Sequence, residues 1–298
     1  MNKPLVSVLM TAYNREKFIS DAIESVLAST YTNFELIIVD DCSTDSTFAI
    51  AKKYAEKDSR IKSYVNEVNL QDYPNRNKAA SYASGKYLKY LDSDDTIYPW
   101  GLESMIYCME KHPDAGFGLM SRNMDTIASF PIKLSGEQAY KAFFFNCALL
   151  TMGPSGSIVR KDVFDEAGGF SGKPYIGDLE MWLKLTKKYA VVCMPTDLIW
   201  WRQHDGQQYM EGHNNFYYEN NTFNLYKKVL TDQDCPLQKQ DAEIALRNQY
   251  NIRSRRVIRN IFKLKLSKGI AFYKKNQLTL NDLVKSIHRN KVKSYSAE

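Results

Sequence analysis

The segment "ELIIVDD", residues 35–41, decides the fold. Its central residues, Leu36–Val39, are all apolar, and two aspartates follow them directly. A continuous apolar run of this kind is typical of a strand that is buried on both faces of a parallel sheet. On its N-terminal side, the strand-like run "LVSVLM" (5–10) leads into "EKFISDAIESVLAS" (16–29), where apolar residues recur every four positions. That spacing predicts a helix between two strands.

The same alternation continues on the C-terminal side. We expect a helix over "STDSTFAIAKKYAEK" (43–57), a strand over "IKSYVN" (61–66), a helix over "NRNKAASYAS" (75–84) that ends at Gly85, and a strand over "KYLKYLD" (86–92). Strands that alternate with helices predict an α/β fold with a mostly parallel sheet and right-handed crossovers. Such sheets bind ligands beyond the carboxyl ends of their strands.

Polar clusters follow three of the predicted strands: "TAYNRE" (11–16), "DDCSTD" (40–45) and "DSDD" (92–95). Two carboxylates a few ångströms apart repel by about 4 kcal/mol at an effective dielectric near 20, so the last cluster needs a counter-charge. Mg²⁺ or Mn²⁺ prefers carboxylate and phosphate oxygens, which predicts a phosphorylated ligand. The alternative is an acidic turn that caps the next helix, because Asp and Ser are common in turns.

The second half of the chain is less regular. Strands are expected over "AGFGLMSR" (115–122) and "SGSIVR" (155–160), and a helix within "YIGDLEMWLKLTKKYA" (175–190). From about Asp205 the pattern is helical and then basic. We therefore predict a catalytic domain over 1–205, with a nucleotide-binding part at about 1–95 and an acceptor part at about 96–205. A C-terminal helical, basic extension is expected over 206–298.

Several classes of protein are disfavoured by composition. The five cysteines are widely spaced and form no CxxC pair, which argues against a disulfide framework or a zinc site. The glycine-rich phosphate loops GxGxxG and GxxxxGKS do not occur. The N-terminus reads as a strand and not as a signal peptide, and the longest apolar run, "AFFFNCALLTMG" (142–153), is too short to cross a bilayer as a helix. A cytoplasmic protein is expected.

Several ordered motifs together resemble a known family. They are "VSVLMTAYNREKFISDAIESVL" (6–27), "FELIIVDDCSTDST" (34–47), "NRNKAASYASGKYLKYLDSDD" (75–95), "GGF" (168–170) and "IGDLEMWLKL" (176–185). Over roughly residues 5–205 the chain is similar to family 2 glycosyltransferases, which have the GT-A fold. The resemblance implies an inverting transfer of a sugar from a nucleotide diphosphate donor, with UDP favoured, to an acceptor hydroxyl.

The resemblance also implies a nucleotide pocket. By position, Thr11, Ala12 and Tyr13 would line it, with Tyr13 against the base. Asp41 would accept a hydrogen bond from the uracil imide, which suits a carboxylate because it is only an acceptor. Arg76 matches the family's arginine in the same pocket.

The "DSDD" segment corresponds to the family's metal motif. Asp95 would be the direct ligand of Mn²⁺ or Mg²⁺, Asp94 would lie near the ribose, and Asp92 would support the site. A metal that bridges the two phosphates would stabilise the departing nucleoside diphosphate. His204, with Arg202 two residues before it, matches an Arg-x-His element beside the diphosphate. It would ligate the metal or donate to phosphate, unless it is a structural histidine.

A general base must take the proton of the acceptor hydroxyl. Asp178 occupies the family's base position, and Glu180 is the reserve candidate. The family often has another acid immediately before the base, whereas this chain has Gly177. The alternative for Asp178 is a helix N-cap with a lowered pKa, which would make a poor base.

The C-terminal extension is strongly basic. Residues 251–298 hold thirteen Lys/Arg and two acids, so the rest of the chain is net acidic although the whole carries +6. Within "RSRRVIRNIFKLKLSKGI" (253–270), a helical wheel places the apolar residues on one arc and Arg256, Arg259 and Lys263 on the other. Such a helix suits the interface of an anionic membrane, where lipid-linked acceptors are found, or packing against the catalytic domain. No nucleic-acid motif accompanies it, so nucleic acid is not an expected partner.

Two other functions remain as alternatives. A nucleotidyltransferase would carry a Gly/Arg-rich loop where this chain has "TAYNRE", and a non-catalytic nucleotide-sugar binding module would keep the fold without the chemistry. The sequence favours a metal-dependent glycosyltransferase that acts on a saccharide or lipid-linked acceptor in surface polysaccharide or glycolipid synthesis.

Overall fold

The computed structural model describes residues 3–121, 124, 128–204, 217–262, 269–270, 273–274 and 278–287. The chain divides into two compact units. Met1–Ala139 and Ala148–Gln207 form the first, and Tyr140–Cys147 and Gln208–Glu298 form the second. The short segment Tyr140–Cys147 therefore belongs with the C-terminal part of the chain.

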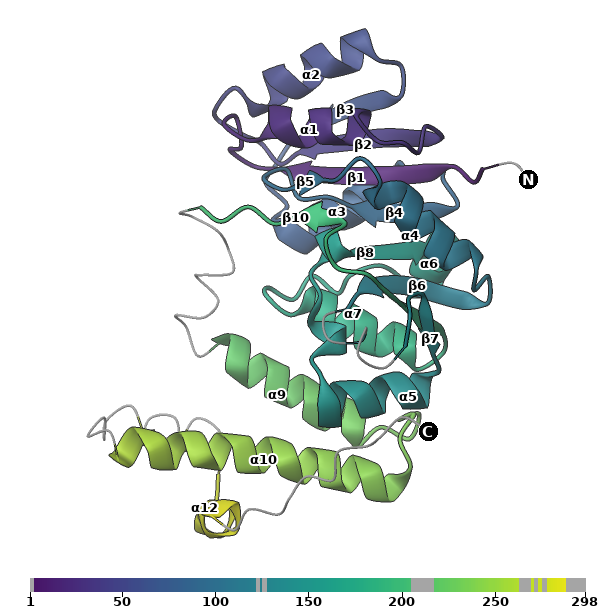
Figure 1. The fold of residues 1–298 in the computed structure, drawn as a ribbon. Coiled ribbons are helices and arrows are strands. Elements are labelled where there is room, and N and C mark those ends of the chain that lie inside the picture. Colours follow the sequence, from purple (N-terminus) through teal and green to yellow (C-terminus); the bar gives the residue numbers. More distant parts are fainter. Residues whose placement is uncertain are drawn as a thin grey trace. The chain divides into compact units, whose positions relative to one another are not determined.

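An eight-stranded sheet forms the centre of the first unit (Figure 1). In chain order its strands are β1 (Val6–Ala12), β2 (Phe34–Asp40), β3 (Ile61–Val65), β4 (Tyr87–Tyr90), β6 (Ala115–Met120), β7 (Ile132–Leu134), β8 (Ser157–Arg160) and β9 (Ala190–Met194). The spatial order is β3-β2-β1-β4-β8-β6-β9-β7. The pairs β3/β2, β2/β1, β1/β4 and β6/β9 are parallel, whereas β8 is antiparallel to both neighbours and β7 to β9. The predicted α/β fold with a mostly parallel sheet is confirmed.

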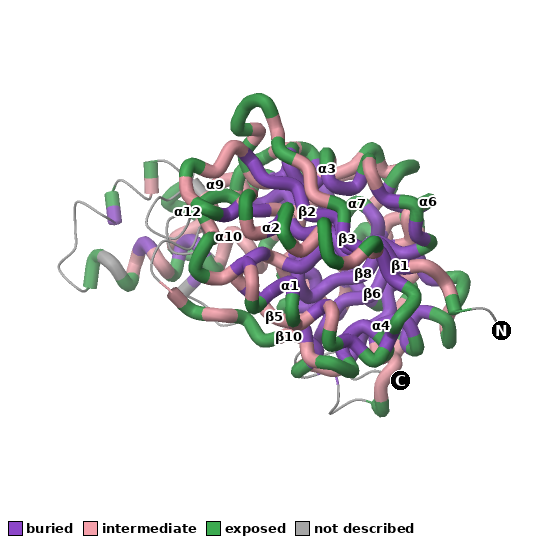
Figure 2. The backbone as a smooth tube through the Cα atoms, turned by 90° about the horizontal axis from the view of Figure 1, so that it is seen from above, coloured by how far each residue is buried: buried purple, intermediate pink, exposed green. Residues whose placement is uncertain are grey.

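Helices cover both faces of this sheet. They are α1 (Ile19–Leu27), α2 (Thr47–Lys57), α3 (Asp72–Ser81), α4 (Gly101–Glu110), α6 (Lys161–Glu166) and α7 (Gly177–Thr186), while α5 (Gly136–Lys141) runs from the first unit into the second. Apolar residues of α1 and α4 share one core cluster with Val6, Val8 and Met10 of β1. Helix α3 packs against β1 and β2 outside that cluster. Figure 2 shows the strands as the buried interior of the unit.

The decisive segment behaves as its pattern predicts. All seven residues of β2 are buried, and the strand lies between β1 and β3. The register aligns Ala12 with Asp40, and Leu91 follows β4 with its N–H bonded to the Leu9 carbonyl. The carboxyl ends of β1, β2 and β4 therefore lie at one edge of the sheet, where Asp40 and the segment 92–95 begin the loops.

Three local predictions need correction. Helix α3 begins at Asp72 and ends at Ser81, three residues earlier at each end than the sequence pattern indicated. Gly85 does not end it; a Cβ there would lie 2.6 Å from the Ser7 amide nitrogen, so the glycine is needed for close packing against β1. Residues Pro154–Gly156 form a short 3₁₀ turn, and the strand starts only at Ser157.

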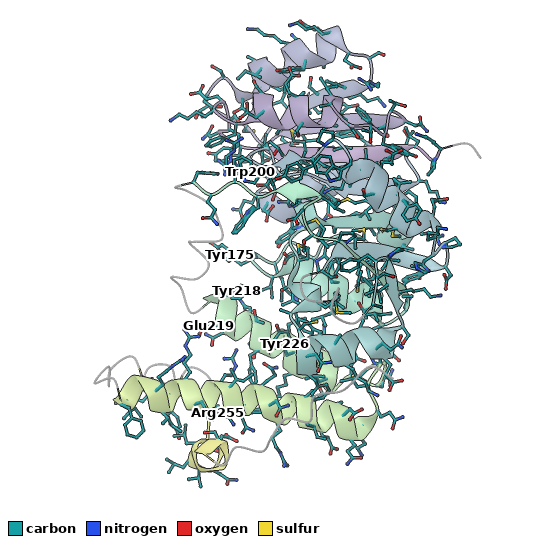
Figure 3. All side chains as sticks on the ribbon, in the orientation of Figure 1. Tyr175, Trp200, Tyr218, Glu219, Tyr226 and Arg255 are labelled. Carbon is teal, nitrogen blue, oxygen red and sulfur yellow. The ribbon has the colours of Figure 1, made fainter. Side chains whose placement is uncertain are left out.

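The second unit is helical, as expected for the C-terminal extension. It contains α9 (Tyr217–Leu230), α10 (Lys239–Phe262) and α12 (Leu280–Ile287), and Figure 3 labels Glu219 and Tyr226 on α9 and Arg255 on α10. Val257 packs with Leu278 in a small core, whereas Ile261 and Phe262 are exposed. Lys263 lies outside the described residues. Among the residues that the structure describes, no helix combines the length and hydrophobicity that a membrane span requires.

Candidate active site

The loop after β2 is organised by its two aspartates. Asp40 is buried, and its Oδ1 accepts a hydrogen bond of 2.8 Å from the Ser43 N–H. Burial raises the pKa of Asp40. Asp41 accepts three hydrogen bonds: from Asn66 Nδ2 (2.7 Å) and the Leu70 N–H (2.8 Å) at Oδ1, and from the Gln71 N–H (2.8 Å) at Oδ2. A carboxylate has about four acceptor positions, so one position on Oδ2 is left for a ligand.

The predicted nucleotide residues at the end of β1 lie beside this loop. The Ala12 carbonyl accepts a 2.8 Å bond from the Asp41 N–H, and the Thr11 carbonyl accepts a 2.9 Å bond from Ser93 Oγ. These two backbone groups thus tie the three loops together. Tyr13 is 47% exposed, so its ring is accessible to a ligand at this edge of the sheet.

The three acids of "DSDD" form one cluster. One carboxylate oxygen from each of Asp92, Asp94 and Asp95 lies within 4.8 Å of the others. Asp95 is almost fully buried; its Oδ1 accepts a 3.1 Å bond from the Arg202 N–H, while its Oδ2 is buried without a hydrogen-bond partner among the described residues. Burial, reinforced by the charges of Asp92 and Asp94, raises the pKa of Asp95 to about 7. An orphaned, buried carboxylate oxygen beside two further acids fits a hard cation such as Mg²⁺ or Mn²⁺.

Asp94 is paired by the protein itself. Its Oδ2 lies 2.9 Å from Arg15 Nε and 3.0 Å from His204 Nε2. The His204 ring packs against Phe18, with ring centroids 4.5 Å apart and planes tilted by 32°. In this arrangement Nε2 of His204 faces the Asp94 carboxylate. The role of His204 as a metal ligand or as a donor to phosphate stays a prediction.

Asp92 is paired as well. Arg76 Nη1 lies 2.8 Å from its Oδ1, and Nε of the same guanidinium donates a 2.7 Å bond to Asp72. Burial opposes the ionisation of Asp92, but the charge and hydrogen bond of Arg76, together with Ser155 and Lys89, outweigh it and lower the pKa of Asp92. Arg76 is therefore brought to the acid cluster as a buried cation, and its contact with a nucleotide stays a prediction.

A second buried cation lies under the cluster. Lys89 is 0% exposed within β4, and its Nζ donates to the carbonyls of Tyr90 and Ser155. Ser155 Oγ in turn accepts a 3.0 Å bond from the Asp92 N–H. Burial lowers the pKa of Lys89 to about 7, against the favourable effect of the nearby acids. Sequence reasoning missed Lys89, although a lysine inside the apolar run "KYLKYL" is a usable signal; it also singled out neither Arg15 nor Ser155.

The candidate base Asp178 lies in the first turn of α7. Its Oδ1 accepts a 2.7 Å bond from the Leu179 N–H, but Ile176 and not Asp178 is the N-cap residue. Although the residue keeps some exposure, burial of the carboxylate raises the pKa of Asp178 to about 6. The alternative of an N-cap with a lowered pKa is therefore wrong, and the raised value suits a base at neutral pH.

The reserve candidate Glu180 is engaged elsewhere. Ser171 Oγ donates to Oε2 of Glu180, and Lys173 Nζ lies 2.5 Å from Oε1. An acid held by an ammonium group is a weaker proton acceptor, because the positive charge favours its ionised form.

Comparisons with known proteins identify the family of the chain. The sequence profile described as "Glycosyl transferase family 2" matches residues 7–168. The putative teichuronic acid biosynthesis glycosyltransferase TuaG of Bacillus subtilis is 33% identical over 195 residues, which are 62% of this chain and 73% of TuaG. The UDP-Glc:alpha-D-GlcNAc-diphosphoundecaprenol beta-1,3-glucosyltransferase WfgD of Escherichia coli is 43% identical over 112 residues, which are 38% of this chain and only 44% of WfgD.

Solved structures share the fold. S. aureus TarS 1–349 in complex with UDP-GlcNAc superposes with a TM-score of 0.70 at 19% identity, over 95% of this chain and 81% of that one. At this identity the likeness concerns the fold alone. Fold, family profile and the similarity to TuaG agree: the chain belongs to glycosyl transferase family 2 and is a glycosyltransferase with the GT-A fold.

Proposed function

We propose that this glycosyltransferase uses a UDP-sugar together with Mn²⁺ or Mg²⁺ and inverts the configuration of the transferred sugar. The observation that carries the proposal is the unequal pairing of the three acids. Asp92 and Asp94 have protein cations as partners, whereas Asp95 keeps a buried oxygen without one. A buried acceptor without a donor is costly, and a cation delivered with the donor substrate would satisfy it.

Different residues would contact different parts of the donor substrate. Asp95, with Asp92 and Asp94 beside it, would hold the cation, which supplies Lewis-acid stabilisation of the departing diphosphate when bound. The exposed ring of Tyr13 would lie against the base, and the open position on Asp41 Oδ2 would accept from the uracil imide. Arg15 would keep the Asp94 carboxylate turned toward the ribose side.

Asp178 would complete the reaction as general base. Its carboxylate is ionised above a pH of about 6 and can accept the proton of the acceptor hydroxyl. The acceptor oxygen forms its bond to the anomeric carbon as the bond from that carbon to the phosphate oxygen breaks. A single displacement of this kind inverts the anomeric configuration.

For the acceptor we propose a saccharide or a lipid-linked saccharide of a surface polysaccharide or glycolipid. The names of TuaG and WfgD point to teichuronic acid synthesis and to a diphosphoundecaprenol acceptor in those two proteins. Contact with a membrane would run through the second unit, where Ile252, Arg255, Arg259 and Phe262 are all exposed on α10.

A thermal-shift panel tests the donor and the metal together. UDP-glucose and UDP-N-acetylglucosamine should raise Tm only when Mn²⁺ is present, whereas GDP- and dTDP-sugars should not. Asp95→Ala should abolish the metal-dependent shift, and Asp114→Ala, a surface acid paired with Lys133, should keep it. Equal shifts with and without Mn²⁺, or with GDP-sugars, would contradict the proposal.

A further inference from the structure

Lys89 is a lysine inside a fully buried strand. The residue is 0% exposed, and its neighbours on β4, Leu88 and Tyr90, are buried as well. Burial of an amino group that can carry a charge is costly, because backbone carbonyls replace only part of its hydration. A methionine of similar length would fill the same space without that cost. The packing of the core therefore does not explain why a lysine stands here.

The amine of Lys89 bridges two segments of chain. The backbone pairing of β4 with β8 reaches as far as Leu88 and Val159. Beyond this pair, Nζ of Lys89 donates to the Tyr90 carbonyl at 2.5 Å and also to the carbonyl of Ser155, in the 3₁₀ turn that precedes β8. An ammonium group and a neutral amine both have the two N–H donors that these bonds need. The bridge thus continues the connection between β4 and the segment before β8.

The bridged turn also contacts the acid cluster. Ser155 is 6% exposed, and its Oγ accepts a 3.0 Å bond from the Asp92 N–H. Asp92 is the first of the three acids whose carboxylate oxygens lie within 4.8 Å of one another. Since Lys89 binds the backbone of Ser155 through its carbonyl, it determines where the serine hydroxyl meets Asp92.

The same segment is attached to the helix of the candidate base. The Met152 carbonyl accepts a 2.7 Å bond from Nε1 of Trp182, which is 0% exposed on α7. Asp178 lies in the first turn of that helix. Residues 152–155 therefore connect α7 to the end of β4, and Lys89 is the side chain of β4 that holds them there.

We propose that Lys89 is a positioning residue for the cation site: it holds the turn at Ser155, and the Ser155 hydroxyl keeps the backbone of Asp92 in place beside Asp94 and Asp95. The inference rests on the proposed binding of Mn²⁺ or Mg²⁺ by these acids. Lys89 is not a ligand itself, because an ammonium group has no acceptor. Groups that orient metal ligands commonly change metal affinity by about 10- to 100-fold.

The first test measures the Mn²⁺ concentration that gives half-maximal binding of trace radiolabelled UDP in equilibrium dialysis. Lys89→Met should raise this concentration about tenfold, because the turn is released. Loss of a positive charge would by itself strengthen the binding of a cation, so the direction of the change separates positioning from charge. An unchanged or lower Mn²⁺ requirement overturns the proposal.

The matched control removes a lysine that also binds a backbone carbonyl. Lys184 is exposed on α7, and its Nζ donates to the Ala167 carbonyl. Lys184→Met changes the charge of the protein as Lys89→Met does, and it should leave the Mn²⁺ requirement unchanged. An equal rise in both variants would mean that the effect of Lys89→Met is not specific to the turn, which also overturns the proposal.

Ser155→Ala tests the path from the lysine to the acid. This variant keeps the carbonyl that Lys89 binds and removes the hydroxyl that Asp92 binds, so it should also raise the Mn²⁺ requirement severalfold. Lys89→Met combined with Ser155→Ala should raise it no further than the stronger single change, because both break one chain of contacts. Additive rises, or a Ser155→Ala protein with the wild-type requirement, overturn the proposal. The second result decides even where Lys89→Met folds poorly.

Hydrogen exchange followed by mass spectrometry tests the bridge without metal or nucleotide. Lys89→Met should speed exchange severalfold in peptides that cover 91–95 and 150–157, and Lys184→Met should not. Unchanged exchange in these peptides overturns the bridge. If the wild-type protein binds no UDP at any Mn²⁺ concentration while Lys89→Met still speeds exchange, the proposed metal-dependent binding of UDP fails and the contact of Lys89 stands. The two failures are therefore distinguishable.

Discussion

The three neighbouring acids at the end of β4 differ in their partners within the protein. The sequence places Asp92, Asp94 and Asp95 within four positions, and charge repulsion alone predicts one shared cation for all of them. In the structure Arg76 and Arg15 already pair with two of the acids. The protein thus supplies part of the counter-charge itself, from partners 16 and 79 residues away along the chain that local spacing does not reveal.

Gly177 is predicted to tolerate no side chain. Gly177→Ala should lower the free energy of unfolding by about 1–3 kcal/mol, because the new Cβ meets the buried ring of Tyr73. Gly153→Ala is the matched control, since a Cβ there has nothing within 4 Å. Urea unfolding of both variants checks this, and equal stability of the two would contradict the close contact.

The raised pKa of Asp178 predicts a gain in stability on neutralisation. The folded state binds this proton more tightly than the unfolded state, so the ionised group destabilises the protein as pH rises through about 6. Asp178→Asn should therefore raise the free energy of unfolding by about 1–3 kcal/mol at pH 8, with the difference vanishing near pH 4.

The control for that measurement is Asp114, whose pKa is shifted in the opposite direction to that of Asp178. The hydrogen bond from Lys133 lowers the pKa of the exposed Asp114. Asp114→Asn should therefore not raise the free energy of unfolding at pH 8. Urea unfolding of both variants at pH 4 and pH 8 decides the question. An Asp178→Asn protein that is no more stable than wild type at pH 8 would show that the carboxylate is well solvated.

At the scale of elements, α3 connects the parts of the site. Arg76 reaches the acid cluster, and the ring of Tyr73 lies against Gly177 at the start of α7. Asn75 Oδ1 accepts a 2.9 Å bond from Asn66, which also binds Asp41. The sequence predicted this helix but not its role. Its apolar periodicity is weak because the buried face carries Tyr, Asn and Arg, so burial there depends on long-range partners that no helical pattern reveals.

A pair of hydrogen bonds fixes the "GGF" segment to α3. Asn77 Nδ2 donates to the Phe170 carbonyl at 2.8 Å, and the Phe170 N–H donates to Asn77 Oδ1 at 2.9 Å. Asn77→Ala should cost about 1–3 kcal/mol of stability and speed chymotryptic cleavage after Phe170. Asn33→Ala, which loses one exposed bond to Lys3, should cost less and leave that cleavage unchanged. Equal effects of the two variants would mean that the segment is held by its aromatic packing instead.

For the molecule as a whole, the strand and helix order of the first half was predictable because buried parallel strands are continuous apolar runs. The unit to which residues 140–147 belong could not be predicted from the sequence. "AFFFNC" is apolar enough for any core, and the structure groups it with the C-terminal helices, where Phe143 and Phe144 contact Tyr226. Composition says that a segment is buried but not which core receives it. The family assignment replaces the nucleotidyltransferase alternative, which spacing of acids alone had left open.

The second unit predicts binding of the chain to anionic membranes. Phe262 is 83% exposed and Leu280 is 73% exposed, and Arg255 and Arg259 are exposed on the same helix as Phe262. Apolar side chains that enter the headgroup region, together with arginines that meet anionic lipid, give an affinity that salt weakens. The protein should therefore sediment with vesicles of phosphatidylglycerol and phosphatidylcholine, and less so with phosphatidylcholine alone or in 0.5 M NaCl, a concentration at which the Debye length is only about 4 Å.

The contribution of apolar side chains to membrane binding can be measured separately from that of the positive charges. Phe262→Ser with Leu280→Ser should reduce sedimentation with the anionic vesicles severalfold, since each side chain loses about 1.5–3 kcal/mol of burial in the interface. Val68→Ser, a residue of the first unit that is 64% exposed, should leave sedimentation unchanged. If the double variant sediments like the wild type while NaCl still releases both, charge alone holds the protein at the membrane; if neither change matters, the predicted mode of membrane binding is wrong.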